Sequence, residues 1–386
     1  MTKFQLFFKA IDNEIAIDAD VLRRMQGGRM GFLPLRPFKT RALFEYGNRG
    51  KLAYRIFLVF FFLSFPFLVF FQVLISLFGS SLRRKEFNCH SLLLNANGKS
   101  VSLFLGCSHE PDFFSVDFAK GECFLGDNCI SVRRGATLLD VIGAGKDSYF
   151  AFMKFLCQGR SFGNLPQLYV TFDWFLSYRF LVGFRDSSCI KEIYFANHYD
   201  RWAVMFDCVF QRKKIVLMQH GKFPEQLELK GKLANIDEVV LLNPDSKRHL
   251  GIFVENPELL KISFVMPKLD LSVVDSPSGM TVLIIGQPQS VEHEITLMKI
   301  LSDNAPNLCV LLKPHPVHGV RIYKGVPSSI VLVESNCFPK TDLAICFEST
   351  LGTEYESMGI PVIWWGKMKP VEVAQRIRNF FDKKST

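Results

Sequence analysis

The sequence predicts an α/β protein in which two Rossmann-like domains follow an N-terminal hydrophobic segment. The chain has 386 residues, which suits two domains because one domain usually takes roughly 100 to 200 residues. From about residue 100, short apolar runs alternate with polar or helical stretches, a pattern typical of βαβ units and parallel sheets. The window from Ile56 to Phe78 is apolar throughout and stands apart from both series.

The window from Ile56 to Phe78 contains no charged residue. As a helix it is long enough to cross a hydrocarbon core of about 30 Å. Pro66 near its middle offers another arrangement, two short helices that enter and leave the bilayer on one face. Basic residues flank the window on both sides, which favours the second arrangement and gives no clear orientation for the first. A buried core helix is the third alternative. We expect attachment to the cytoplasmic face of the inner (plasma) membrane.

Composition narrows the class of protein. Hydrophobic residues make up 48% and charged residues 22% of the chain, so the sequence can bury cores and is neither disordered nor polytopic. The net charge of +9 fits an anionic membrane or an anionic substrate; nucleic acid is disfavoured, because no basic stripe with interleaved aromatic residues occurs. The ten cysteines form no CxxC pair and no zinc-like spacing, so we expect reduced, buried thiols and no metal site.

The chain divides at changes in composition. The residues of an N-terminal arm, 1–55, indicate no function, and the hydrophobic segment follows at 56–78. The two Rossmann-like domains are 90–274 and 280–386, and a linker of turn residues joins them. The first domain has candidate strands at Val101–Leu105, Glu192–Phe195, Lys214–Met218 and Glu238–Leu242. The second has them at Thr281–Ile285, Leu308–Leu312, Ile330–Val333, Leu343–Cys346 and Pro361–Trp365.

Polar residues follow many of these strands directly. In open parallel sheets, ligands bind at the carboxyl ends of the strands, so these positions are the candidate site. In the first domain they are Asn197-His198, Gln219-His220-Gly221 and Asn243. In the second they are Gly286-Gln287-Pro288, Lys313-Pro314-His315-Pro316 and Glu348-Ser349-Thr350.

The Lys-Pro-His-Pro segment places a cation and an imidazole on one stiff loop, because proline fixes its own φ and restricts its neighbour. Lys313 and His315 together suit a phosphate or diphosphate leaving group, whose developing negative charge needs stabilisation. A basic surface loop is the alternative reading.

Ser349 and Thr350 stand where a helix begins, and a helix N-terminus favours an anion such as phosphate. Glu354, about one turn later, would accept hydrogen bonds from ribose hydroxyls. The alternative is a plain capping box that needs no ligand.

His220 ends a strand of the first domain beside Gly221, which permits a tight turn and close approach by a ligand. Its imidazole is a candidate general base, phosphate contact or orienting group. A structural strand-end histidine is the alternative. His198 is a weaker candidate, and the His109–Asp112 loop offers a carboxylate that a solvated loop explains as well.

These motifs together resemble bacterial GT-B transferases of surface-polysaccharide synthesis. The Gln-His-Gly run at 219–221, the Lys-Pro-His-Pro run at 313–316 and the stretch from Glu348 to Trp365 carry the resemblance, which covers about residues 190–370. The superfamily includes capsule sialyl- and Kdo-transferases and CDP-glycerol-type polymerases of teichoic acid. The acidic D/E-D/E-G motif that supplies the base in the sialyltransferase-like families is absent from this sequence.

The resemblance implies two domains facing a cleft and a role for each. The C-terminal domain would bind the nucleotide-activated sugar as a co-substrate, with no further cofactor, and the N-terminal domain would bind a glycan or lipid-linked acceptor. His315, Ser349 and Thr350 match the positions that contact donor phosphate, and Glu354, with Gly359 and Pro361, matches the E-x4-G-x-P pattern of the ribose ligand. Catalysis would rest on His220 and His315, and donor binding on Lys313, His315, Ser349, Thr350, Glu354 and Gly286.

Three functions remain open from the sequence. The first is a membrane-associated glycosyltransferase, with either inversion or retention, that uses a CMP-sugar or another NDP-sugar without a metal. The second is a CDP-alditol phosphotransferase that transfers phosphoglycerol or phosphoribitol. The third is an inactive membrane scaffold of a polysaccharide-assembly complex. A sugar-nucleotide epimerase of the same fold is disfavoured, because it would gain nothing evident from an anchor.

Overall fold

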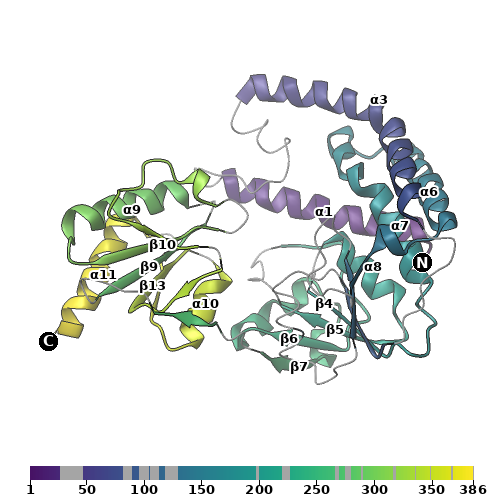
Figure 1. Ribbon diagram of the computed structural model, residues 1–386. Coiled ribbons are helices and arrows are strands. Elements are labelled where there is room, and N and C mark those ends of the chain that lie inside the picture. The colour runs from purple at the N-terminus through teal and green to yellow at the C-terminus, as the bar shows by residue number, and fades with distance from the viewer. Residues whose placement is uncertain are drawn as a thin grey trace. The chain divides into compact units, whose positions relative to one another are not determined.

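The structure is a computed structural model whose chain divides into two compact units (Figure 1). Unit 1 comprises Met1–Arg24 and Arg41–Val265, and unit 2 comprises Met25–Thr40 and Met266–Thr386. The residues described are 1–26, 47–80, 89–94, 104, 113–117, 129–196, 200–219, 227–265, 269–273, 280–287, 290–315, 319–334, 336–347, 349–366 and 368–385.

The strands of unit 1 form a parallel sheet in the order β3-β2-β1-β4-β5-β6-β7. The strands are β1 (Ser91–Leu94), β2 (Phe113–Asp117), β3 (Cys129–Ser131), β4 (Glu192–Phe195), β5 (Lys214–Met218), β6 (Glu238–Leu241) and β7 (Lys261–Phe264). The helices are α1 (Lys3–Gln26), α3 (Gly47–Gly79), α5 (Val132–Gly135), α6 (Leu138–Cys157), η2 (Phe162–Val170), α7 (Thr171–Val182), α8 (Arg201–Val209), η3 (Pro244–Ile252) and η4 (Pro257–Leu259). All residues of β1 and β6 are buried, as parallel strands covered on both faces require.

Unit 2 holds a second parallel sheet in the order β11-β10-β9-β13-β14. Its strands are β9 (Thr281–Ile285), β10 (Cys309–Lys313), β11 (Val331–Leu332), β13 (Leu343–Cys346) and β14 (Val362–Trp364), and β8 (Leu271–Ser272) pairs separately with β12 (Phe338–Pro339). The helices are α9 (Val291–Asn304), η5 (Val320–Ile322), α10 (Thr350–Ser357) and α11 (Pro370–Ser385). The prediction of two parallel-sheet α/β units with an N-terminal apolar helix is confirmed.

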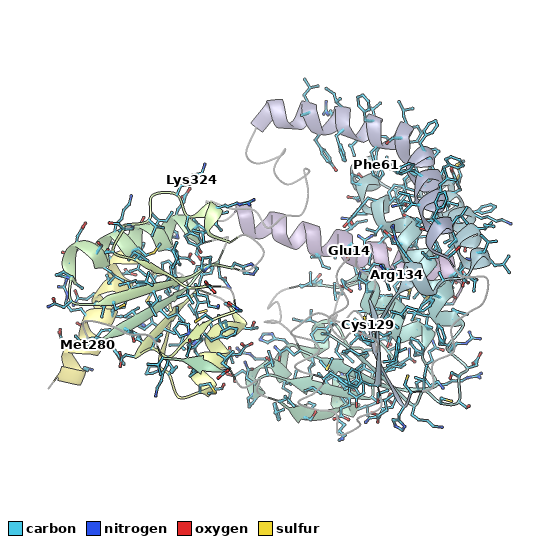
Figure 2. The ribbon with its side chains drawn as sticks, in the orientation of Figure 1. Glu14, Phe61, Cys129, Arg134, Met280 and Lys324 are labelled. Carbon is cyan, nitrogen blue, oxygen red and sulfur yellow. The ribbon has the colours of Figure 1, made fainter. Side chains whose placement is uncertain are left out.

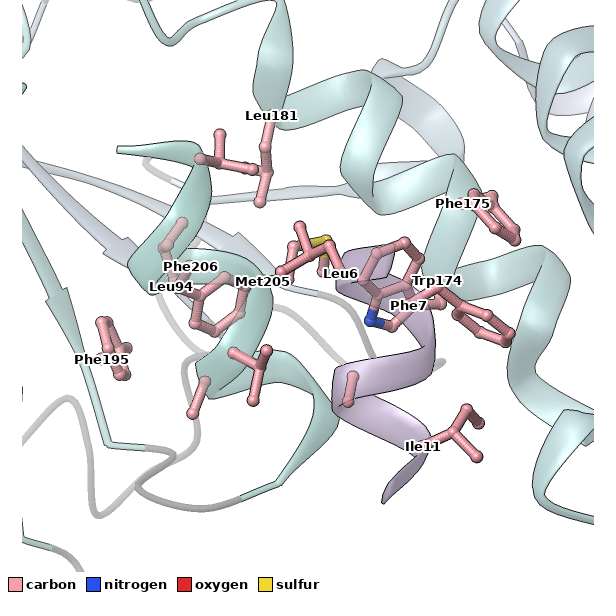
Figure 3. Packing of buried hydrophobic residues seen from close by; sticks show 14 of the residues in the cluster. Leu6, Phe7, Ile11, Leu94, Trp174, Phe175, Leu181, Phe195, Met205 and Phe206 are labelled. Atoms are coloured by element: carbon pink, nitrogen blue, oxygen red, sulfur yellow. The ribbon is translucent and has the colours of Figure 1, made fainter. Parts of the chain in front are cut away.

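Helix α1 belongs to the core of unit 1 (Figure 3). Phe7 is fully buried, and its ring centroid lies 5.2 Å from that of Trp174 and 5.0 Å from that of Phe175, both on α7. Farther along α1, the buried Glu14 carboxylate lies 3.4 Å from Nε of Arg201, the first residue of α8. The arm to which the sequence assigned no function therefore supplies part of the hydrophobic core.

Helix α3 runs through the hydrophobic segment without a break, with Pro66 inside it. The arrangement in which Pro66 divides the segment into two helices was wrong. One stripe of α3, including Leu58, Phe65 and Val69, is buried against unit 1, while only 22% of its most apolar window is buried. The core-helix alternative therefore does not describe it either. Figure 2 shows many α3 side chains standing out from the ribbon, away from the body of unit 1.

The strand predictions hold where apolar runs are continuous. β4, β5, β9 and β13 have the predicted bounds, and β6, β10, β11 and β14 differ by one or two residues at their ends. The strand predicted at Val101–Leu105 lies outside the described residues except at Phe104, which is helical. Strands β1, β2, β3 and β7 were not predicted, because short runs flanked by polar residues carry little periodicity.

The expectation that all cysteines are reduced and buried was wrong. Cys129 is disulfide-bonded, and the other described cysteines are free, so its partner is not among them. Cys157 and Cys189 are exposed. A disulfide depends on the approach of segments in space, and no CxxC spacing pointed to this one.

Because Phe7 is enclosed by aromatic rings, we expect Phe7→Ala to lower the free energy of unfolding by about 3–5 kcal/mol, the usual range for a phenylalanine truncated in a core. The matched control is Phe78→Ala, since Phe78 is 93% exposed. Chemical denaturation of the full chain in detergent measures both. Equal stability of the two variants would show that α1 is not part of the core.

Candidate functional site

The carboxyl ends of three strands in unit 2 lie level with one another. Ile285, the last residue of β9, pairs with Lys313 of β10 on one side and with Cys346 of β13 on the other. From β9 the chain builds β10 and β11 outward, and then returns to place β13 on the other side of β9, so the strand order reverses between β9 and β13. Such a reversal is where open α/β sheets bind ligands.

Gly286 leaves β9 at this level and has close neighbours. Its amide donates to the Lys313 carbonyl oxygen at 2.9 Å. A Cβ added to Gly286 would lie 2.1 Å from Oη of Tyr323 and 3.1 Å from that same carbonyl oxygen. Only glycine fits here without a shift, so the sequence-predicted Gly286 holds the loop close to the sheet.

Lys313 and His315 leave β10, and the structure gives them different surroundings. The Lys313 ammonium donates to the carbonyl oxygens of Glu334 at 2.9 Å and Cys337 at 2.5 Å, and lies 4.4 Å from the Phe338 ring centroid. Burial lowers the pKa of this lysine. His315 is only partly buried, and its carbonyl oxygen accepts from the amide of Gly319. Lys313 therefore holds the segment after β11, and its predicted phosphate contact stays a prediction.

Ser349 caps the helix α10 that follows β13. Its Oγ accepts from the Leu351 amide at 3.2 Å, so Ser349 is the N-cap. The third helical residue is Gly352, which has no side chain to complete the predicted capping box. The hydroxyl hydrogen remains a donor that a ligand oxygen can use. Thr350 is the first helical residue, and Glu354 stands one turn later on the same side of the helix, 7% exposed.

Gly352 brings α10 close to the sheet. A Cβ at this position would lie 2.7 Å from a ring carbon of Trp364 and 2.8 Å from the Cys346 sulfur. The helix N-terminus is therefore seated directly over the ends of β13 and β14.

A buried carboxylate that sequence reasoning missed lies beside Gly286. Glu294, on α9, is fully buried and accepts hydrogen bonds from Ser290 Oγ at 2.6 Å, the Gln287 amide at 2.9 Å and Tyr323 Oη at 2.6 Å. Burial raises the Glu294 pKa to about 7, against the smaller lowering by these hydrogen bonds. Burial and the nearby Glu294 likewise raise the Tyr323 pKa. The Ser-x-x-x-Glu spacing at 290–294 was the available signal, and it indicates only a helix start.

The polar strand-end residues of unit 1 that the structure describes hold its loops. The buried Gln219 side chain donates to Ser246 Oγ at 2.9 Å and accepts from the Leu242 amide at 2.9 Å. Asn243 caps the next helical turn by accepting from the Ser246 amide. His198, His220 and Gly221 lie outside the described residues, as do Pro316, Glu348 and the His109–Asp112 loop, so the roles predicted for them stay predictions.

Among the described residues, no group of three His, Cys, Asp or Glu side chains is arranged to hold a metal ion. The expectation that no metal is required stays a prediction.

The Glu294 network predicts a pH-dependent stability. Because the folded-state pKa is about 7 and the usual value is 4.5, the carboxyl is neutral and well accommodated below about pH 4.5. As the pH rises from about 4.5 to about 7, the unfolded chain releases this proton while the buried carboxyl keeps it, so the fold loses at most about 3 kcal/mol of stability. We expect Glu294→Gln, which imitates the neutral acid, to melt above the parent by a margin that grows between pH 5 and 8.

The control for this experiment is Glu292→Gln, on the exposed side of the same helix, whose margin should stay constant with pH. A constant margin for Glu294→Gln as well would show that Glu294 is already ionised in the folded protein at pH 5.

The contact at Gly286 predicts a coupled pair of substitutions. We expect Gly286→Ala to lower the melting temperature, because the new methyl group displaces Tyr323 Oη from Glu294. Adding Tyr323→Phe removes the clashing oxygen, so the double variant should lose less than the sum of the two single losses. Thermal melts of the four proteins measure the coupling; strict additivity would contradict it.

The sequence matches no protein-family model and no curated protein. Among solved structures, the chain is similar to UDP-N-acetylglucosamine 2-epimerase from Rickettsia bellii, at 10% identity over 73% of this chain and 80% of that one, with a TM-score of 0.41. It is also similar to Anabaena HepE in complex with UDP-glucose, at 11% identity over 77% and 91% of the two chains and a TM-score of 0.42. A third is the wall teichoic acid polymerase TagF, at 8% identity over 71% and 69% and a TM-score of 0.39. All three TM-scores lie below 0.5.

Proposed function

We propose that this protein is a GT-B-type glycosyltransferase that moves a sugar from a nucleotide-activated donor to a bacterial surface polysaccharide or lipid-linked glycan. The observation that carries the proposal is the common level of three strand ends in unit 2. It brings Gly286, the loop with His315 and the capped N-terminus at Ser349 to the point where the strand order reverses. These three features suit the diphosphate of a nucleoside diphosphate. Glycine lets the backbone approach the phosphates, and the imidazole N–H and the helix N-terminus offer hydrogen-bond donors.

In this proposal the donor phosphates bind between His315 and the Ser349–Thr350 helix start. Gly286 lets the phosphate chain approach the backbone of the β9 end. Lys313 adds positive charge from beneath the loop while its ammonium stays on the carbonyl oxygens of Glu334 and Cys337. Glu354, one helical turn beyond Thr350, accepts from the ribose hydroxyls.

The reaction joins an acceptor hydroxyl oxygen to the anomeric carbon of the sugar. The bond from that carbon to the donor phosphate oxygen breaks, and its electron pair leaves on the nucleotide. His315 donates a hydrogen bond to the departing phosphate, and no metal ion is needed to neutralise it. The acceptor proton passes to a base, for which we propose His220 of unit 1. EDTA treatment should leave the activity unchanged.

Two other functions are distinguishable by experiment. A CDP-alditol phosphotransferase would use the same phosphate contacts, but its product would gain phosphorus, which product mass detects. An inactive scaffold would bind no nucleotide and would tolerate substitution of His315 and Glu354. Under the main proposal the acceptor binds unit 1, and α3 attaches the enzyme to the cytoplasmic face of the inner membrane.

Nucleotide-dependent thermal stabilisation tests the proposal. The detergent-purified full chain is melted with CMP, CDP, UDP, GDP and their sugar conjugates, because a ligand that binds only the folded state raises its stability. We expect one nucleotide class to raise the melting temperature. His315→Ala should lower affinity for that nucleotide by about tenfold or more, since a hydrogen bond to a charged group contributes about 1.5–3 kcal/mol.

His249→Ala is the matched control, because His249 lies on η3 of unit 1 and bonds only to its neighbour Arg248 among the contacts the structure shows. It should keep the full shift. No shift with any nucleotide, or an equal shift in both histidine variants, would reject this site.

A further inference from the structure

The exposed side of α6 is apolar. Leu139, Ile142, Phe150 and Met153 are 49% to 77% exposed, and their spacing places them on one side of the helix. Phe152, on another side of α6, packs into the core of unit 1. No uncharged window marks α6 in the sequence, because two aspartates and two lysines interrupt its apolar residues.

Helices α3 and α6 pack against each other. Phe65 of α3 stacks on Phe152 of α6 with 4.5 Å between ring centroids, and Tyr149 Oη of α6 donates to the Pro66 carbonyl oxygen at 2.7 Å. Farther along, Gly145 is so close to Val73 that a Cβ would lie 2.6 Å from its methyl group. The second half of α3 therefore runs beside α6 (Figure 1).

We define the α3–α6 face by six strongly exposed apolar residues, three from each helix. They are Phe60, Phe67, Phe71, Leu139, Ile142 and Met153. Phe60, Phe67 and Phe71 recur at helical spacing on the side of α3 opposite its buried stripe. Large exposed apolar side chains gathered on two adjoining helices mark an interaction site.

The charges around the α3–α6 face are positive where they are exposed. Between Leu138 and Val170 the acidic residues are Asp140 and Asp147, and both are buried. The exposed charges of α6 are Lys146 and Lys154. Lys146, seven residues from both Leu139 and Met153, lies within the apolar side of α6. An apolar face that carries exposed lysines is complementary to a bilayer that contains anionic lipids.

A basic hollow lies at the C-terminal end of α6. Its lining includes Phe4, one carboxylate, Asp12, and three lysines, Lys9, Lys154 and Lys230, so it carries a net positive charge; its volume is about 510 Å³. Lipid phosphate groups carry the charge that such a hollow attracts.

The position of α6 argues against a transmembrane passage of α3. Because α6 runs beside the second half of α3, that half and α6 would reach the same depth in a bilayer. A crossing would bring Lys146 and Lys154 into the hydrocarbon, together with Asp147 and its ion pairs to Lys3 at 2.6 Å and to Arg179 at 2.7 Å. Charges at that depth are costly, whereas lysines at the headgroup level are favourable.

We propose that α3 and α6 together form one membrane-binding face, the α3–α6 face, which lies in the interface of an anionic bilayer without crossing it. This deepens the membrane association within the proposed function, and it holds whether or not unit 2 transfers a sugar. It makes α6 a second membrane-binding helix and fixes the orientation of unit 1 on the lipid surface.

Vesicle flotation of the full chain, without nucleotide, tests the face. The protein is diluted from detergent into phosphatidylcholine vesicles, or into vesicles in which about a third of the lipid is phosphatidylglycerol. We expect tighter binding to the anionic vesicles. The triple variant Leu139→Gln, Ile142→Gln, Met153→Gln should bind them at least about tenfold more weakly, because each apolar group withdrawn from lipid lowers the affinity.

The matched control replaces three apolar residues with comparable exposure elsewhere, Leu259→Gln, Val273→Gln and Val371→Gln. It should bind like the parent. Equal binding by the two triple variants would overturn the role of α6, and equal binding to neutral and anionic vesicles would overturn the lipid class.

Depth measurements distinguish lying from spanning. Single cysteines at Phe60, Phe67 and Phe78, in a background where the exposed Cys157 and Cys189 are serines, carry a nitroxide label. We expect a similar, shallow depth at all three positions. A deep Phe67 between two shallow ends would show a crossing and overturn the proposal. None of these measurements depends on nucleotide binding, so their results do not change if the proposed sugar transfer proves wrong.

Discussion

Parallel pairing of strands is the constraint on which the candidate site depends. Because β9, β10 and β13 run in the same direction and are in register at Ile285, Lys313 and Cys346, the segments that follow them emerge at one edge of the sheet. Each segment alone is ordinary: a glycine turn, a proline-stiffened loop and a capped helix. Their common position follows from the backbone hydrogen bonds between the strands, which do not depend on the side chains of the site.

Buried polar networks then fix the shape of that edge. Glu294 joins the β9 loop to Tyr323, and the Lys313 ammonium joins the β10 end to the segment after β11. Both groups are ionisable, yet each has its hydrogen bonds met by backbone or hydroxyl partners, as burial requires. These interactions hold the loops in place, so their loss is expected to lower the stability of unit 2.

In unit 1, hydrophobic packing fixes the positions of the N-terminal helices. Helix α1 fills the core beside Trp174 and Phe175, while α3 packs only one stripe against the unit and leaves the rest exposed (Figures 1 and 3). The two N-terminal helices thus differ in kind. The first stabilises the fold, and the second, together with α6, offers an apolar face that a folded soluble domain would not leave bare.

The sequence by itself determined the buried strands, since a continuous apolar run such as Thr281–Ile285 has no other low-energy place than the middle of a covered sheet. It also determined the polar residues that follow those strands and the apolar character of Ile56–Phe78, whereas the tertiary structure decided that this window is one helix. Only the tertiary structure decided that Lys313 is held by the Glu334 and Cys337 carbonyl oxygens, that Glu294 is buried beside Gly286, and that α6 runs beside α3. These features depend on contacts between segments far apart in the chain, and local periodicity carries no record of such contacts.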